Sequence, residues 1–166
     1  MAADTSRHHA IKELTDTLSQ LLDREVQINA AASGEPTEIV VRYVDGSGDL
    51  VAAWTVERVL SWSLGAALTM VPRGMVDEAI KNGSADAQID ENFKEVVNVL
   101  ATAAANVVAR RAVLESITEE APTLMRTARQ ISAAGGHWTV LEVNVDGYPP
   151  GRMAVSFAPP AQADAE

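Results

Sequence analysis

The order of helix-like and strand-like segments constrains the fold of this chain more than any other feature. Residues 8–23 come first and repeat leucine and isoleucine at helical spacing. A block of β-branched, alternating segments follows, then a block of helical segments, and finally two more alternating segments. The strand segments are residues 26–30, 38–44, 50–55, 137–145 and 153–157, and the helical ones are 56–68, 75–81 and a long one from Asp86 or Asp90 to about Leu114. Strands segregated from helices predict an α+β fold, with two long helices packed on one face of a mostly antiparallel sheet.

Glycine-rich junctions and single glycines punctuate these segments. The sequence Asp45-Gly46-Ser47-Gly48-Asp49 lies between two strand segments and predicts a hairpin. Gly65, alone within the helical segment 56–68, indicates close packing against a neighbour. Residues 123–132 are ambiguous, because their propensities favour a helix while their apolar pattern is weak. We expect one domain over residues 1–157, followed by a disordered, Pro/Ala-rich tail at 158–166.

The composition argues against several classes of function. The chain has 166 residues, a formal net charge of −10 and only 13 scattered lysines and arginines, which form no basic patch for nucleic acid. Cysteine is absent, which excludes disulfides, thiolate metal sites and cysteine nucleophiles. His8, His9 and His137 are too far apart in sequence and setting to indicate a zinc site. No uncharged run reaches the about 20 residues of a bilayer span, and the first residues do not resemble a signal peptide. We therefore expect a cytoplasmic protein with no metal, cofactor or membrane partner.

The long predicted helix carries the pattern most informative about function. At about 100° per residue, its apolar side chains gather in one stripe. The stripe consists of Phe93, Val96, Val97, Leu100, Ala101, Ala104, Val107 and Val108. Glu91, Glu95, Asn98 and Thr102 fall on the opposite side, so the helix is expected to present carboxylates and one amide to solvent. Such a line suits contact with a partner protein, and it also fits an ordinary solvated helix face.

Glu95 and Asn98 resemble the motif of the bacterial chemotaxis phosphatase family, which includes CheC, CheX and the rotor phosphatase FliY. In that family an Asp or Ser stands four residues before the glutamate, where this chain keeps a carboxylate as Glu91. A proline follows farther along the family's sequence, and this chain has Pro122 at nearly the expected distance. The order of elements looks most like the CheX branch. The resemblance implies a CheC/CheX-like fold over most of residues 7–157.

The same resemblance implies an activity, hydrolysis of the aspartyl phosphate on a response-regulator receiver domain of CheY type. It assigns Asn98 to orienting the attacking water and Glu95 to docking a lysine of the partner, with Glu91 and Thr102 in contact around them. A carboxamide suits the first task because it accepts a hydrogen bond from water and donates one to a phosphoryl oxygen. The receiver domain supplies Mg²⁺, so the phosphatase needs no cofactor of its own.

The first predicted helix contains a related pair, Glu13 and Asp16, at the place of a second active motif in CheC. Ionised Asp16 cannot donate a hydrogen bond and would repel a phosphoryl group, so we expect this N-terminal copy to be inactive. Two alternatives to a phosphatase stay open. One is a non-catalytic CheX-like module for binding or dimerisation, since the CheX branch forms homodimers. The other is an unrelated α+β domain whose acidic helix face is only solvated.

Overall fold

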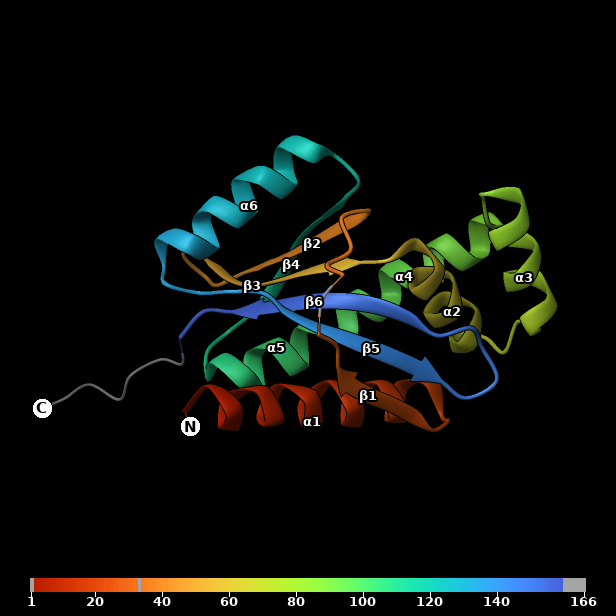
Figure 1. The fold of residues 1–166 in the computed structure, drawn as a ribbon, viewed down its shortest axis with the longest axis horizontal. Coiled ribbons are helices and arrows are strands. Elements are labelled where there is room, and N and C mark those ends of the chain that lie inside the picture. Colours follow the sequence, from red (N-terminus) through yellow and green to blue (C-terminus); the bar gives the residue numbers. More distant parts are fainter. Residues whose placement is uncertain (1, 33, 160–166) are drawn as a thin grey trace, which may run out of the picture.

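The structure is a computed structural model that describes residues 2–32 and 34–159, with side chains from Ser6 onward. Within these residues, six strands form one antiparallel sheet in the spatial order β1-β5-β6-β3-β2-β4 (Figure 1). The strands are β1 (Val26–Ala30), β2 (Ile39–Val44), β3 (Leu50–Val56), β4 (Val113–Thr118), β5 (Thr139–Val145) and β6 (Gly151–Phe157). The helices are α1 (Ala2–Leu22), α2 (Arg58–Leu68), α3 (Arg73–Asn82), α4 (Ala87–Val99), α5 (Ala101–Val108) and α6 (Ala121–Ala133). The predicted α+β fold is confirmed.

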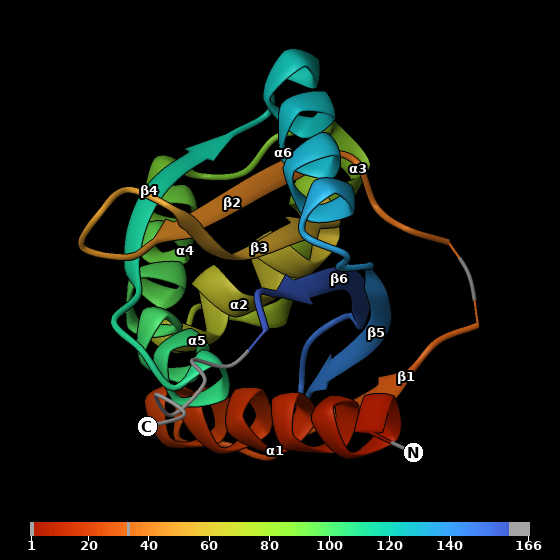
Figure 2. The same ribbon diagram turned by 90° about the vertical axis from the view of Figure 1, so that its left-hand side faces the viewer.

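Helices cover both faces of the sheet (Figure 2). Successive residues of β2 show which helix lies on which face. The Tyr43 hydroxyl donates to the carbonyl oxygen of Val97 in α4, whereas the Arg42 guanidinium donates to Thr127 Oγ1 in α6. The helices α1, α2, α4 and α5 lie on the Tyr43 face, and α6 lies on the Arg42 face. The long helices thus pack on one face, as predicted, while the layer formed by α6 was not predicted.

The core fills the space between the sheet and the helices on the Tyr43 face. Trp54 is fully buried there and Trp62 is 5% exposed. α2 and α4 pack closely at Gly65, where a Cβ atom would lie 2.2 Å from the carbonyl oxygen of Ile89. Gly65 therefore lets one helix backbone touch the other, which confirms the packing role that its isolated position indicated.

The long helix predicted to reach Leu114 is wrong only beyond Val108. α4 ends at Val99, α5 ends at Val108, and Ala109 then adopts a left-handed conformation with a φ of 55°. The chain turns there, and Val113–Thr118 pairs with β2 as the edge strand β4. Residues other than glycine seldom adopt this conformation, so the alanine at position 109 does not indicate the end of a helix in the sequence. α1 also begins earlier than predicted, because its first turn reaches back to Ala2.

The ambiguous residues 123–132 belong to α6, whose contact with the sheet is partly polar. Thr127 is fully buried and Ile131 is 7% exposed. Beneath them, the Arg42 guanidinium donates to Thr127 Oγ1 at 2.6 Å and to Gln130 Oε1 at 2.8 Å. Its Nε lies 2.9 Å from Glu115 Oε1 of β4. Arg42 is 3% exposed, so these partners take the place of the water that would hydrate its charge at the surface.

A bulge interrupts β4 beside this arginine. Arg42 is paired with Ser116 and Tyr43 with Leu114, so Glu115 is an extra residue on the edge strand. The bulge turns the Glu115 carboxylate toward the Arg42 guanidinium. At the other end of the chain, the predicted disordered tail starts at residue 158, where the Ala158 N–H still donates to the Val51 carbonyl oxygen at 2.8 Å. Residues 160–166 of that tail lie outside the described residues.

The β2–β3 hairpin predicted around residues 45–49 is present and is held by one carboxylate. Asp45 Oδ1 accepts from the backbone N–H groups of Ser47 at 2.8 Å and of Asp49 at 3.1 Å. These two hydrogen bonds, the Ser47 one foremost, hold the pKa of Asp45 below its ordinary value of 3.8.

The stability that Asp45 contributes should therefore depend on pH. A carboxyl group whose pKa is lower in the folded state stabilises the fold above its unfolded pKa of 3.8, and this contribution is lost as the pH falls through the folded value. We expect Asp45→Asn to be less stable than the natural protein near neutral pH, with a difference that shrinks below pH 3.8. Urea unfolding of both proteins from about pH 7 to about pH 2.5 measures this difference. A difference that is constant over the whole range would contradict the assignment.

Candidate functional site

α4 is fixed in place by its cap and by its buried face. Asp86 Oδ1 accepts from the backbone N–H of Gln88 at 2.8 Å, so Asp86 is the N-cap and the predicted alternative, Asp90, is not. The buried residues of the helix are Ile89, Asn92, Phe93, Val96 and Val97. This set contains the three residues of the predicted apolar stripe that belong to α4, which are Phe93, Val96 and Val97. It adds Ile89 and one amide, Asn92, which the stripe did not include.

Asn92 joins α4 to α2 through a buried hydrogen-bond network. Its Nδ2 donates to the carbonyl oxygen of Gly65 at 2.9 Å and to Thr69 Oγ1 at 2.8 Å. Its Oδ1 accepts from Gln88 Nε2 at 2.8 Å. Both ends of this amide are therefore occupied within the protein, and Asn92 serves to position α4.

The opposite face of α4 carries the predicted line of polar residues. Glu91, Glu95 and Asn98 are exposed, and Thr102 is exposed at the start of α5. Glu91 Oε1 lies 3.0 Å from Lys94 Nζ, so this carboxylate has an ion-pair partner. Among the described residues, neither Glu95 nor Asn98 has a side-chain hydrogen bond or ion pair. The structure thus presents one carboxylate and one carboxamide, three positions apart, with unused hydrogen-bonding capacity.

The backbone beneath Asn98 is tied to the sheet. The Tyr43 hydroxyl donates to the carbonyl oxygen of Val97 at 2.6 Å and accepts from Trp54 Nε1 at 2.8 Å. Both rings are buried, with their centroids 4.9 Å apart. Burial raises the pKa of Tyr43 far above its ordinary value, so its hydroxyl stays a neutral donor. The carbonyl that it holds belongs to the residue just before Asn98, at the last turn of α4.

Further acidic groups lie toward the beginning of α4. The pKa of Asp90 is raised, chiefly because partial burial disfavours its charged form and additionally because Glu119 lies near. The hydrogen bond with Trp62 and then the charges of Lys94 and Arg58 oppose this shift less strongly. Three carboxylates, those of Asp90, Glu91 and Glu95, and one lysine, Lys94, are thus exposed on α4.

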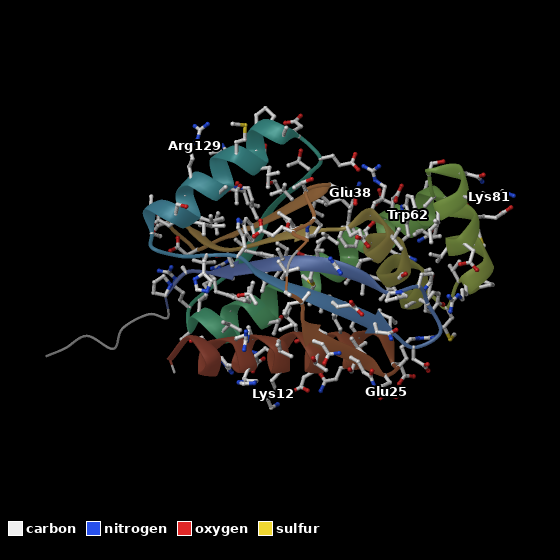
Figure 3. The ribbon with its side chains drawn as sticks, viewed as in Figure 1. Lys12, Glu25, Glu38, Trp62, Lys81 and Arg129 are labelled. Atoms are coloured by element: carbon white, nitrogen blue, oxygen red, sulfur yellow. The ribbon has the colours of Figure 1, made fainter. Side chains whose placement is uncertain are left out.

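The related pair on α1 is engaged differently. Glu13 Oε2 accepts from Asn106 Nδ2 of α5 at 3.0 Å, and Asp16 Oδ2 lies 2.5 Å from Lys12 Nζ. Figure 3 shows Lys12 pointing outward from α1, on the side remote from the sheet. Both α1 carboxylates thus have partners within the chain, in contrast to Glu95.

Pro122 occupies the first turn of α6. Its fixed φ and missing N–H suit that position whatever the function of the domain, so its placement adds nothing to the site. Within residues 2–32 and 34–159, no cluster of three or more His, Asp or Glu side chains could hold a metal ion. None of the helices in the same residues is both long enough and apolar enough to cross a membrane.

No protein-family model matches the sequence, and no curated protein matches it. Solved structures of flagellar proteins do match. A chain of the FliM–SpeE complex from H. pylori has a TM-score of 0.64 at 8% identity, covering 95% of this chain and 86% of that chain. The FliM middle domain of Vibrio alginolyticus has a TM-score of 0.60 at 8% identity, covering 95% and 94%. FliY of Thermotoga maritima has a TM-score of 0.50 at 11% identity, covering 90% and 84%.

The chain has a CheC-like fold. This CheC-like fold includes phosphatases that act on phosphorylated CheY and also the non-catalytic FliM domains. Identities of 8 to 11% establish the fold alone and do not separate its branches. The resemblance read from Glu95 and Asn98 is thus confirmed at the level of fold, and their roles stay predictions.

Proposed function

We propose that this CheC-like domain is a phosphatase that hydrolyses the aspartyl phosphate of a CheY-like receiver domain in the cytoplasm. The observation that carries the proposal is the exposed pair of Glu95 and Asn98, whose side chains have no partner among the described residues, on a helix held at three points. The anchors are the Asp86 cap, the Asn92 network and the Tyr43 hydroxyl. A side chain that positions a reactant must be held rigidly, because a small displacement of the reactant lowers the reaction rate steeply. The order of elements favours the CheX branch within this proposal.

Asn98 is assigned to the attacking water. Its amide oxygen accepts a hydrogen bond from that water, and its amide nitrogen donates to an oxygen of the phosphoryl group. The water attacks phosphorus in line with the departing aspartate oxygen, the P–O bond to aspartate breaks, and inorganic phosphate leaves. The neutral amide adds no negative charge near the phosphoryl oxygens. Mg²⁺ enters with the receiver domain and offsets the charge on these oxygens, so this chain needs no cofactor of its own.

Glu95 is assigned to docking. A carboxylate one turn before Asn98 suits a lysine beside the phosphorylated aspartate of the partner. Glu91 is less available because Lys94 lies 3.0 Å from it, so its contribution is electrostatic and smaller. Thr102 begins the next helix and is assigned to contact with the partner. All of these residues are exposed and need no rearrangement to meet a second protein.

The test is the rate of phosphate loss from a ³²P-labelled CheY-like receiver domain with Mg²⁺. The natural protein is expected to accelerate this loss. Asn98→Ala should lower the accelerated rate about 100-fold with binding retained, because the water loses its positioning group. Asn98→Asp, nearly isosteric, should be equally inactive because it cannot donate and carries charge. Glu95→Ala should instead raise the KM about tenfold.

Asn106→Ala is the matched control for this series. Asn106 is also an exposed asparagine, on the helix that follows Asn98, and its amide is bonded to Glu13. Its removal should leave the dephosphorylation rate unchanged. Equal loss of activity in Asn98→Ala and Asn106→Ala would contradict the assignment of the water to Asn98.

A second candidate is a non-catalytic binding or dimerisation module. It is suggested by the structural likeness to FliM, with TM-scores of 0.64 and 0.60. FliM is seen in complexes with SpeE and with FliG in the H. pylori structures. If this chain is such a module, it will bind the receiver domain or a second copy of itself without accelerating phosphate loss. Measuring binding and phosphate release on the same samples separates the two functions.

A further inference from the structure

A cavity of about 260 Å³ lies at the end of the molecule where α5 ends and α1 begins, at the left of Figure 1. None of the residues of the proposed phosphatase site lines it. Most of its apolar lining comes from two helices and two strands. These residues are Ala10, Ile11, Val107, Leu141, Val155 and Phe157. The Phe157 ring packs edge-on against Trp54 with 5.3 Å between centroids, so that wall continues into the core.

The polar lining of the cavity differs from the rest of this acidic chain. His9 from α1 and His137 from the segment before β5 both line it, and they are two of the three histidines in the sequence. Arg7 lines it too, while keeping an interaction of its own. Thr139 and Ser156 add hydroxyl groups. The chain has 23 aspartates and glutamates, yet the described lining residues include none of them.

The polar and the apolar residues that line the cavity differ in their exposure to solvent. His9, His137 and Arg7 are exposed, whereas Leu141 and Val155 are buried. Nitrogen donors therefore stand toward solvent and hydrocarbon lies deeper. A ligand that fits this arrangement has an apolar body directed inward and an anionic head at the surface, because imidazole and guanidinium groups donate to an anion.

We propose that this cavity binds a small organic carboxylate with an apolar body, such as a medium-chain fatty acid. Its size sets the length of the body. An engineered apolar cavity of about 150 Å³ takes up benzene, so about 260 Å³ accommodates roughly ten carbon atoms. The carboxylate of the ligand lies between the two histidines, and its apolar body enters between α1, α5 and the ends of β5 and β6.

Octanoate is the probe, and isothermal titration calorimetry measures its binding to the full chain. We expect one saturable site with a Kd below about 1 mM. Acetate keeps the head group without the body, and octylammonium keeps the body with the opposite charge. Both should bind at least about tenfold more weakly. Equal affinity for octanoate and octylammonium would show that the carboxylate is not recognised.

Two variants test the two halves of the site. Val107→Phe fills the cavity from a half-buried position, and it should abolish octanoate binding while leaving both histidines in place. The double variant His9→Gln/His137→Gln keeps the cavity, and it should weaken octanoate about tenfold while leaving 1-octanol unchanged. His8→Gln is the matched control, because His8 is exposed on the same helix but does not line the cavity. Unaltered binding by Val107→Phe, with its fold verified by circular dichroism, would overturn the proposal.

Discussion

Gly65→Ala is expected to lower the free energy of unfolding by about 3 kcal/mol, the upper part of the range for overpacked cores. The added Cβ would lie 2.2 Å from the carbonyl oxygen of Ile89, and a backbone atom cannot swing aside as a side-chain end can. α2 and α4 would have to separate, which would also stretch the 2.9 Å hydrogen bond from Asn92 to the Gly65 carbonyl. Urea unfolding followed by circular dichroism measures the loss.

Gly74→Ala is the matched control for this prediction. Gly74 also lies in a helix, α3, and a Cβ there would meet no atom within 4 Å. Alanine at this position only removes backbone freedom from the unfolded chain, so the variant should be about 0.5 kcal/mol more stable than the natural protein. If both variants shift the stability in the same direction, the close approach of α2 and α4 is not what requires glycine at position 65.

Tyr43→Phe should cost about 2 to 3 kcal/mol, although it removes only one oxygen atom. The Tyr43 hydroxyl satisfies two buried groups at once, the Trp54 N–H at 2.8 Å and the Val97 carbonyl at 2.6 Å. Phenylalanine would leave the indole N–H buried without a partner, since Trp54 is fully buried. The penalty arises from that orphaned donor more than from the lost bond itself.

A double-mutant cycle with Trp54→Phe isolates this effect. In the Trp54→Phe background there is no indole N–H, so removing the Tyr43 hydroxyl leaves no buried donor without a partner. The double variant should therefore lose less free energy of unfolding than the sum of the two single variants. The expected departure from additivity is about 1 kcal/mol or more. Additive costs, within about 0.5 kcal/mol, would mean that the Trp54–Tyr43 hydrogen bond contributes little.

Local signals predicted those parts of the fold in which periodicity and burial agree. The hairpin at residues 45–49, the buried stripe of α4 and the exposure of Glu95 and Asn98 all followed from residue type and spacing. The position of Asn98 on the solvent side was predictable because Val96 and Val97 beside it had to be buried.

The rest depended on contacts that no local pattern reports. α5 ends because Ala109 adopts a left-handed conformation, which an alanine in the sequence does not indicate. Without a recognisable helix end, the strand that begins at Val113 was predicted as a continuation of the helix. α6 was ambiguous because its partner on the sheet is Arg42, a charged residue in a buried place. The anchoring of the Val97 carbonyl by Tyr43 joins residues 54 positions apart in the chain. Such long-range polar contacts carry no periodic signature.

The extra residue at Glu115 also affects how copies of this protein behave at high concentration. An outermost strand with an unbroken row of amide and carbonyl groups is a template on which another chain can add and begin a fibril. Here the row is broken in the middle of β4, and a carboxylate held by Arg42 stands at the break. An incoming strand could not keep its spacing past this point. That margin of the sheet is therefore protected against aggregation.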